Sequence, residues 1–201
     1  MRKRAPYVAS EDSALLRKVL KGYTGGTCLE IGAGNGGNMI ELAKGFEVVV
    51  GTDVARPGTR DWRRAGVSYL LADGATCYAE SSFDMVAFNP PYMPGAVADT
   101  AVDGGPKLEV PMWFLREALR VVRKSGRILM LLNDEARTSD FEEVSARSGF
   151  SLRRVGGRHL FYENLTVYEA SAIDEEGTES GGPVMANLRS LHAGAGIEGK
   201  D

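Results

Sequence analysis

Short apolar runs alternate with amphipathic segments along most of the chain. Runs rich in valine, leucine and isoleucine, typical of buried strands, occupy residues 27–31, 47–52, 67–71, 83–88 and 127–132. Apolar residues three or four positions apart, as on one face of a helix, occur at Leu15, Leu16, Val19 and Leu20, at Met39, Leu42 and Ala43, and at Leu115, Ala118, Leu119 and Val122. A further helix is predicted over residues 140–148. Continuous apolar strands separated by helices predict an α/β fold with a mainly parallel sheet covered on both faces.

The two ends of the pattern differ from its middle. Strand-like runs at residues 152–155 and 165–169 flank a glycine-containing stretch, which predicts a terminal antiparallel hairpin. Residues 93–109 hold three glycines and two prolines and are predicted to form a loop. Residues 172–201 are rich in glycine, glutamate and serine, so we expect a mobile tail after a single domain of residues 1–171.

Composition limits the class of protein. The chain has 201 residues, 43% of them hydrophobic, which suits one globular domain. No apolar run reaches the roughly 18 residues of a membrane span, and no signal-peptide pattern follows the basic start, so we expect a cytoplasmic protein. Cys28 and Cys77 form no C-x-x-C pair and are interpreted as reduced packing residues, with no metal site. A net charge of −3 lacks the overall signature of a nucleic-acid binder.

A glycine-rich turn follows the first predicted strand. Gly32, Gly34 and Gly37 satisfy G-x-G-x-x-G, and Asp53 ends the next strand 19 residues beyond Gly34, counted as 53 − 34. That spacing fits a dinucleotide, with the carboxylate on a ribose. The segment beginning at Glu30 also satisfies E-x-G-x-G-x-G, a nucleoside turn found in methyltransferases. Both interpretations place a nucleoside at the turn.

The acidic residues around the turn favour S-adenosylmethionine. Glu30, just before the turn, would repel a pyrophosphate but suits the ammonium and sulfonium charges of that cofactor. Asp73, after the third predicted strand, provides an acceptor for the adenine exocyclic amine. Open parallel sheets bind ligands at the carboxyl ends of their strands, where Glu30, Asp53 and Asp73 all fall.

The tetrapeptide Asn89-Pro90-Pro91-Tyr92 directly follows the fourth predicted strand. The two prolines stiffen the backbone and remove two N–H donors. The Asn89 side-chain oxygen and the Pro90 carbonyl can then accept hydrogen bonds from both N–H groups of a planar NH2, which raises electron density on its nitrogen. Tyr92 offers a flat face for stacking. This arrangement predicts methyl transfer to an amide or base nitrogen, helped by its positioning.

Several segments together resemble the HemK-type protein-glutamine methyltransferases, in particular their short archaeal and eukaryotic branch. The resemblance covers about residues 7–169. It includes YVASEDSALL at residues 7–16, with Ala9 where the family has proline, and ENLTV at residues 163–167. DGG at residues 103–105, followed by Glu109 and Val110, resembles a family loop that is one residue longer and has a further glycine.

The resemblance implies a fold, a site and partners. The fold is a Rossmann-like class I methyltransferase with seven strands in the order 3-2-1-4-5-7-6. The implied cofactor residues are Asp12, Ser13, Glu30, Gly32, Gly34, Asp53, Asp73 and Asn89, and the implied substrate residues are Asn89, Pro90 and Tyr92. The substrate is the glutamine of the Gly-Gly-Gln loop of a class I release factor. A small zinc-binding activator subunit is implied as partner.

The strand order also suggests where that activator docks. Residues 67–71, VSYLL, become an edge strand that is apolar and uncharged. Such an edge invites pairing with another chain, so we expect strand addition by the activator there. The alternative is that residues 56–66 or the tail cover the edge.

Other functions compete with glutamine methylation. A nucleic-acid amino methyltransferase shares Asn-Pro-Pro-Tyr, but it needs a basic track for the backbone. The candidate basic clusters are Arg60, Arg63 and Arg64, and Arg153, Arg154 and Arg158. A solvated surface explains them equally well. An NAD dehydrogenase would need a catalytic His or a Tyr-Lys pair, neither of which is evident. A non-catalytic module would not need both the cofactor turn and the substrate motif.

Overall fold

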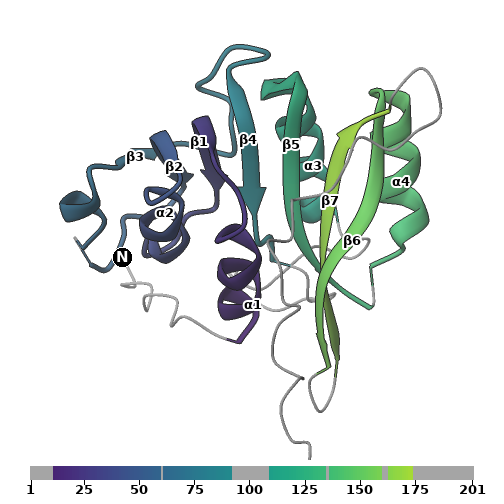
Figure 1. Ribbon diagram of the computed structural model, residues 1–201, viewed down its shortest axis with the longest axis horizontal. Helices are drawn as coiled ribbons and strands as arrows, with labels where there is room; N and C mark the ends of the chain where they lie inside the picture. Colours follow the sequence, from purple (N-terminus) through teal and green to yellow (C-terminus); the bar gives the residue numbers. More distant parts are fainter. Residues whose placement is uncertain (1–10, 60, 92–108, 135, 160–162, 174–201) are drawn as a thin grey trace, which may run out of the picture.

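One sheet of seven strands organises the described part of the chain, in the order β3-β2-β1-β4-β5-β7-β6 (Figure 1). The computed structural model describes residues 11–59, 61–91, 109–134, 136–159 and 163–173. The strands are β1 (Gly25–Ile31), β2 (Phe46–Asp53), β3 (Ser68–Leu71), β4 (Phe83–Phe88), β5 (Val122–Asn133), β6 (Phe150–His159) and β7 (Asn164–Ala172). Strands β1 to β5 pair in parallel, while β7 runs antiparallel to β5 and β6. The predicted strand order and terminal hairpin are confirmed.

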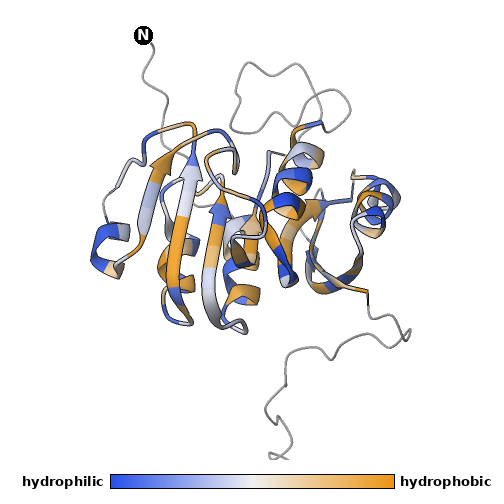
Figure 2. Cartoon of the chain, turned by 90° about the horizontal axis from the view of Figure 1, so that it is seen from above, coloured by the Kyte–Doolittle hydropathy of each residue, from blue (hydrophilic) through white to orange (hydrophobic). Residues whose placement is uncertain are grey.

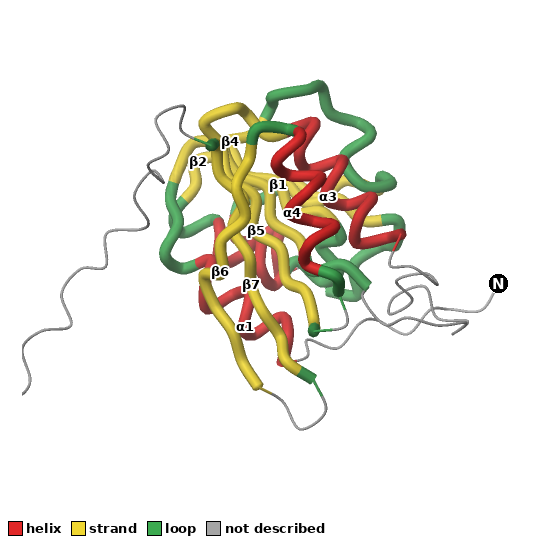
Figure 3. The backbone as a smooth tube through the Cα atoms, turned by 90° about the vertical axis from the view of Figure 1, so that its right-hand side faces the viewer, coloured by secondary structure: helices red, strands yellow, loops and turns green. Residues whose placement is uncertain are grey.

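Helices cover both faces of this sheet. They are α1 (Glu11–Leu20), α2 (Gly37–Leu42), the short 3-10 helix η1 (Asp61–Ala65), α3 (Glu109–Val121) and α4 (Thr138–Arg147). Helices α3 and α4 lie side by side on one face, as Figure 3 shows. Apolar stripes along the strands, visible in Figure 2, supply the surface that the helices bury.

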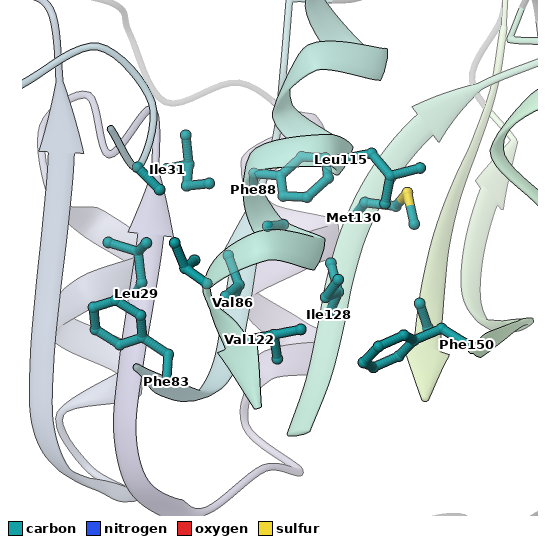
Figure 4. Close-up of a cluster of buried hydrophobic side chains, with 14 of the residues drawn as sticks. Leu29, Ile31, Phe83, Val86, Phe88, Leu115, Val122, Ile128, Met130 and Phe150 are labelled. Atoms are coloured by element: carbon teal, nitrogen blue, oxygen red, sulfur yellow. The ribbon is translucent and has the colours of Figure 1, made fainter. Parts of the chain in front are cut away.

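Two apolar clusters lie on opposite faces of the sheet. Leu29 and Ile31 of β1 belong to the cluster that includes Leu115 of α3, drawn in Figure 4. Cys28, the residue before Leu29, belongs to the cluster that includes Leu16 and Leu20 of α1. Successive side chains of a strand point to opposite faces, so the continuous apolar runs of the sequence supply both clusters.

The junction between α3 and β5 differs from its prediction. Its apolar spacing placed Val122 on the helix, but β5 begins at Val122, which pairs with Phe83. Pairing resumes at Met85 and Arg127, so β5 advances five residues where β4 advances two. Val122 is 3% exposed and belongs to the same cluster as the helix residues. Apolar character alone does not distinguish a buried helix position from a buried strand position, and here the strand pairing determines the outcome.

Three predicted features fall wholly or mainly outside the described residues. The loop predicted for residues 93–109 is described only at Glu109, which begins α3. The tail is described only at residues 172 and 173, and Ala172 is the last residue of β7. Tyr92, the last residue of the Asn-Pro-Pro-Tyr motif, also lies outside the described residues.

Candidate active site

The predicted site residues lie at the carboxyl ends of neighbouring strands. β1 is flanked by β2 and β4, and its last residue is level with Thr52 and Phe88. The next residues on those two strands, Asp53 and Asn89, therefore lie on either side of Gly32. Two strand spacings separate them, which is roughly 10 Å. The sheet thus places the predicted ribose acceptor and the predicted reacting centre on opposite sides of the glycine turn.

Asp53 holds the glycine turn in shape. One of its carboxylate oxygens, Oδ2, accepts the N–H of Gly34 at 2.9 Å, and the other accepts the N–H of Ala55 at 2.8 Å. Gly32 and Gly34 have φ angles of 70° and 52°, in the left-handed region that favours glycine. A Cβ at Gly34 would meet no atom of the described residues within 4 Å, so this side of the turn is open to a ligand.

Aromatic side chains surround the turn, and sequence reasoning did not single them out. The Tyr69 hydroxyl lies 3.0 Å from the carbonyl oxygen of Gly34. Phe114 of α3 packs so closely against Gly32 that an added Cβ there would lie 3.2 Å from its ring. Trp113 packs against Gly74, beyond β3, where an added Cβ would lie 2.3 Å from its ring. These contacts join segments far apart in the sequence, and single aromatic residues in apolar runs carry no signal for them.

Glu30 is a buried carboxyl with one oxygen left over. It is 2% exposed, and its Oε1 accepts a hydrogen bond from Asn38 Nδ2 at 2.7 Å. Arg17 Nε in turn donates to Asn38 Oδ1 at 3.4 Å. The other oxygen, Oε2, is buried and has no hydrogen-bond partner in the described part of the chain. Burial raises the pKa of Glu30 to about 8, although the Asn38 hydrogen bond acts in the opposite direction.

Asp12 and Asn89 are joined across the site. Asn89 Nδ2 donates to Asp12 Oδ2 at 2.9 Å, and the N–H of Ser13 donates to Asp12 Oδ1 at 2.7 Å. Asn89 Oδ1 is buried and has no hydrogen-bond partner among the residues that the structure describes. Asp12 and Ser13 are themselves buried, at 6% and 8% exposure. The structure therefore brings the start of α1 to the end of β4.

Two other predicted residues are described around this centre. Asp73 is exposed, two residues beyond the end of β3, and its backbone carbonyl accepts the Thr76 hydroxyl at 2.7 Å. Pro90 is buried next to Asn89.

Among the described residues, no group of three or more His, Cys, Asp or Glu side chains could hold a metal ion. The described part of the chain contains no helix long and apolar enough to cross a membrane.

Chemically, the site combines an open glycine turn, buried acids and an acceptor-rich corner. Glu30 and Asp53 can face a positively charged or hydroxyl-bearing ligand. Asn89 Oδ1 can accept a hydrogen bond from one N–H of an NH2 group. A donor molecule held at the turn would thus lie beside a group held at Asn89, which is the arrangement that group transfer to a nitrogen requires.

Comparison with known proteins points in the same direction. The chain is 30% identical over 182 residues to a putative protein N5-glutamine methyltransferase of Methanocaldococcus jannaschii, covering 82% of this chain and 90% of that protein. No family model matches the chain.

Solved structures share the fold. A chain of the E. cuniculi Mtq2–Trm112 complex, described as responsible for methylating the eRF1 translation termination factor, aligns with a TM-score of 0.68 and 25% identity. The alignment covers 83% of this chain and 98% of that one. The 1,6-didemethyltoxoflavin-N1-methyltransferase of Burkholderia thailandensis, solved with S-adenosylhomocysteine, aligns with a TM-score of 0.55 and 15% identity, covering 79% and 77%. This second likeness concerns the fold alone.

Proposed function

This chain belongs to the protein N5-glutamine methyltransferase family, and we propose that it methylates the side-chain amide of a glutamine in a class I peptide release factor. The methyl donor is S-adenosylmethionine, and the modified residue is the glutamine of the Gly-Gly-Gln loop. The observation that carries this proposal is the pairing of an open glycine turn with Asn89, whose buried Oδ1 has no hydrogen-bond donor among the described residues. Translation termination places the enzyme in the cytoplasm.

The residues around the turn fit this cofactor. Glu30 Oε2 is a buried oxygen without a partner, suited to the positive charges at the methionine end. The Asp53 carboxylate keeps lone pairs for the ribose hydroxyls besides its two backbone contacts. Asp73 is exposed beyond β3 and serves the adenine amine. Gly32 and Gly34 let the backbone approach the ligand, and Asp12 and Ser13 close the methionine end. When bound, the cofactor supplies an electrophilic methyl group.

The chain's own contribution to the reaction is orientation. An amide nitrogen is a poor nucleophile because its lone pair is delocalised into the carbonyl. Asn89 Oδ1 and the Pro90 carbonyl accept hydrogen bonds from its two N–H groups, which raises electron density on the nitrogen and directs it at the methyl group. Tyr92 stacks on the flat amide in this scheme. Loss of a positioned polar group at a reacting centre commonly costs about a hundredfold or more in rate.

Mass spectrometry of a release factor tests the proposal. The factor would be incubated with this chain, its activator and isotopically labelled S-adenosylmethionine. We expect a single labelled methyl group on the glutamine of the Gly-Gly-Gln loop, and none on a factor in which that glutamine is replaced by alanine. A release factor that stays unlabelled while a nucleic-acid substrate gains the methyl group would refute the assignment.

A small zinc-binding activator subunit docks, in this proposal, on the free edge of β3. Among the described strands, β3 pairs with β2 alone, at one edge of the sheet. Leu70 and Leu71 are 37% and 54% exposed there, and Val54, just beyond the end of β2, is 63% exposed. Strand β6, at the other edge, contains four positively charged or ionisable residues, Arg153, Arg154, Arg158 and His159. Charge blunts an edge, so β3 is the edge that accepts a further strand.

Lysine on this edge should weaken the complex with the activator. We expect Ser68→Lys or Leu70→Lys to lower co-purification of the activator while leaving cofactor affinity unchanged, because both positions are exposed and β3 keeps its pairing with β2. Ala146→Lys, on the exposed face of α4, is the matched control and should leave the complex intact. If the two β3 variants bind the activator as tightly as Ala146→Lys does, β3 is not the docking site.

Glu30→Gln should separate stability from cofactor binding. Burial raises the pKa of Glu30 to about 8, so near pH 7 the folded protein holds this carboxyl protonated. The unfolded chain releases that proton near the ordinary glutamate pKa of about 4.3. The free energy of unfolding of the wild type therefore falls as the pH rises from about 4.3 to about 8. Glutamine keeps the acceptor for Asn38 but cannot ionise.

The variant should therefore melt at a higher temperature than wild type at pH 8.5, with a smaller difference at pH 5. The affinity of the wild type for the cofactor should depend on pH in the direction opposite to its stability. Wild-type affinity should rise with pH up to about 8, because the cofactor's positive charges favour the ionised carboxylate, whereas the variant's affinity should be lower and nearly flat. Thermal melts and calorimetry across this range check both expectations. Parallel pH profiles for the two proteins would contradict them.

A further inference from the structure

We propose that Asp12 is a positioning residue that holds the Asn89 amide in one orientation, with Oδ1 toward the reacting nitrogen. This inference rests on the proposed function and adds a second role to Asp12, beyond contact with the cofactor. The observation behind it is the hydrogen bond from Asn89 Nδ2 to Asp12 Oδ2, at 2.9 Å, which joins residues 77 positions apart.

The chemistry of this contact determines which way the amide faces. A carboxylate only accepts hydrogen bonds, and the group of Asn89 that faces Asp12 is its NH2. The carbonyl oxygen of Asn89 must then point away from Asp12. That oxygen, Oδ1, is the atom left buried without a partner. The NH2 of Asn89 therefore donates to Asp12 within the protein, while its carbonyl oxygen remains as an acceptor for the substrate.

Helix α1 determines where Asp12 lies. Leu16 and Leu20, on the next two turns, are 0% and 1% exposed in the cluster between α1 and the sheet. Asp12 itself is 6% exposed, and its other oxygen accepts the N–H of Ser13 at 2.7 Å. Packing of the helix and this local bond fix the carboxylate from two sides. The position of α1 is thus transmitted to the reacting centre.

Without such a partner, the end of an asparagine side chain has two orientations of similar shape. The terminal torsion is broad and roughly two-fold, so the oxygen and nitrogen can exchange places. In the reversed orientation, Asn89 would present its NH2 to the substrate NH2, and two donors would face each other. That orientation is unproductive, and a charged acceptor behind Asn89 suppresses it.

The first test is Asp12→Asn, which preserves shape but can both donate and accept. Both orientations of Asn89 then find a partner at residue 12. We expect turnover at saturating cofactor and release factor to fall by about tenfold, the usual scale for one hydrogen bond to a charged group. The Kd for S-adenosylmethionine, measured on the same preparation, shows independently of turnover whether the variant is folded and still binds the cofactor. Asp140→Asn, which removes the same charge from the first turn of α4, is the matched control and should keep wild-type turnover.

The second test distinguishes positioning from general support of the fold. In an Asn89→Ala background, Asp12→Asn should cause no further loss of turnover, because the side chain that Asp12 orients is gone. Equal losses in the two backgrounds would overturn the proposal. Unchanged turnover of Asp12→Asn at saturating cofactor would also overturn it, whether or not the Kd rises, since Asp12 would then serve the cofactor alone.

A third measurement does not need the substrate. In protein with ¹⁵N-labelled asparagine, the Asn89 side-chain NH2 should show slow hydrogen exchange in the wild type and faster exchange in Asp12→Asn, while the Asn164 signal is unchanged. If the release factor is never methylated but this difference in exchange is seen, Asp12 does orient Asn89 and the assigned substrate is wrong. If the Asn89 signal does not respond to the substitution, the proposed orientation of Asn89 by Asp12 is refuted.

Discussion

Asn89→Ala should lower turnover by about a hundredfold or more, as loss of an oriented polar group at a reacting centre commonly does. The Kd for S-adenosylmethionine should stay largely unchanged, because the glycine turn is held by Asp53 and by backbone bonds that do not involve Asn89. The loss should therefore fall on kcat. Alanine removes the Oδ1 acceptor, so one proton of the substrate amide loses its partner and the nitrogen is no longer directed at the methyl group.

Steady-state kinetics with a release factor, together with calorimetry of cofactor binding, measure this effect. Asn164→Ala is a useful control, since Asn164 is an exposed amide that hydrogen-bonds to Asp134 and His159. We expect that variant to keep wild-type turnover. Near-normal turnover of Asn89→Ala would refute the role of this residue, and a large rise in Kd with unchanged kcat would make it a cofactor residue only.

Asp53→Ala should have the largest effect on cofactor binding. In the proposed complex the carboxylate accepts both ribose hydroxyls, and each hydrogen bond to a charged group contributes roughly 1.5–3 kcal/mol. The structure adds a second reason, because the same carboxylate accepts the N–H groups of Gly34 and Ala55. Its removal takes away ribose contacts and loosens the turn that carries them. We expect the Kd to rise by about tenfold to a hundredfold or more.

Asp84→Ala provides the matched control for this measurement. Asp84 also accepts a backbone N–H, that of Thr27 at 2.7 Å, and it pairs with Arg123. It lies near the start of β4, at the opposite end of the sheet from the site. Its loss should lower the melting temperature without weakening cofactor binding. Calorimetry should also show no NAD binding to the wild type. Tight NAD binding, or equal Kd values for Asp53→Ala and wild type, would contradict the proposal.

The sequence by itself determined the layers of the fold and the ends of the strands where the site lies. The predicted fourth strand, Phe83–Phe88, is strand β4 without change, because its apolar run stops where Asn89 and the prolines begin. The spacing from Gly34 to Asp53 predicted that the turn and this carboxylate serve one nucleoside, and in the structure the two residues are joined by a hydrogen bond. Both signals are local or follow from one strand-helix-strand unit, whose geometry is nearly constant. The strand order came from the family resemblance.

The tertiary structure decided which side chains meet. Asp12 and Asn89 were each singled out, but only the packing of α1 against the sheet brings them together. Asn38 and Tyr69 were not singled out, although one hydrogen-bonds to Glu30 and the other to the glycine turn. Val122 joined a strand rather than a helix because of its pairing partner. Periodicity along a chain reports which face of an element is buried, whereas a contact depends on how two elements dock, and no local pattern encodes that.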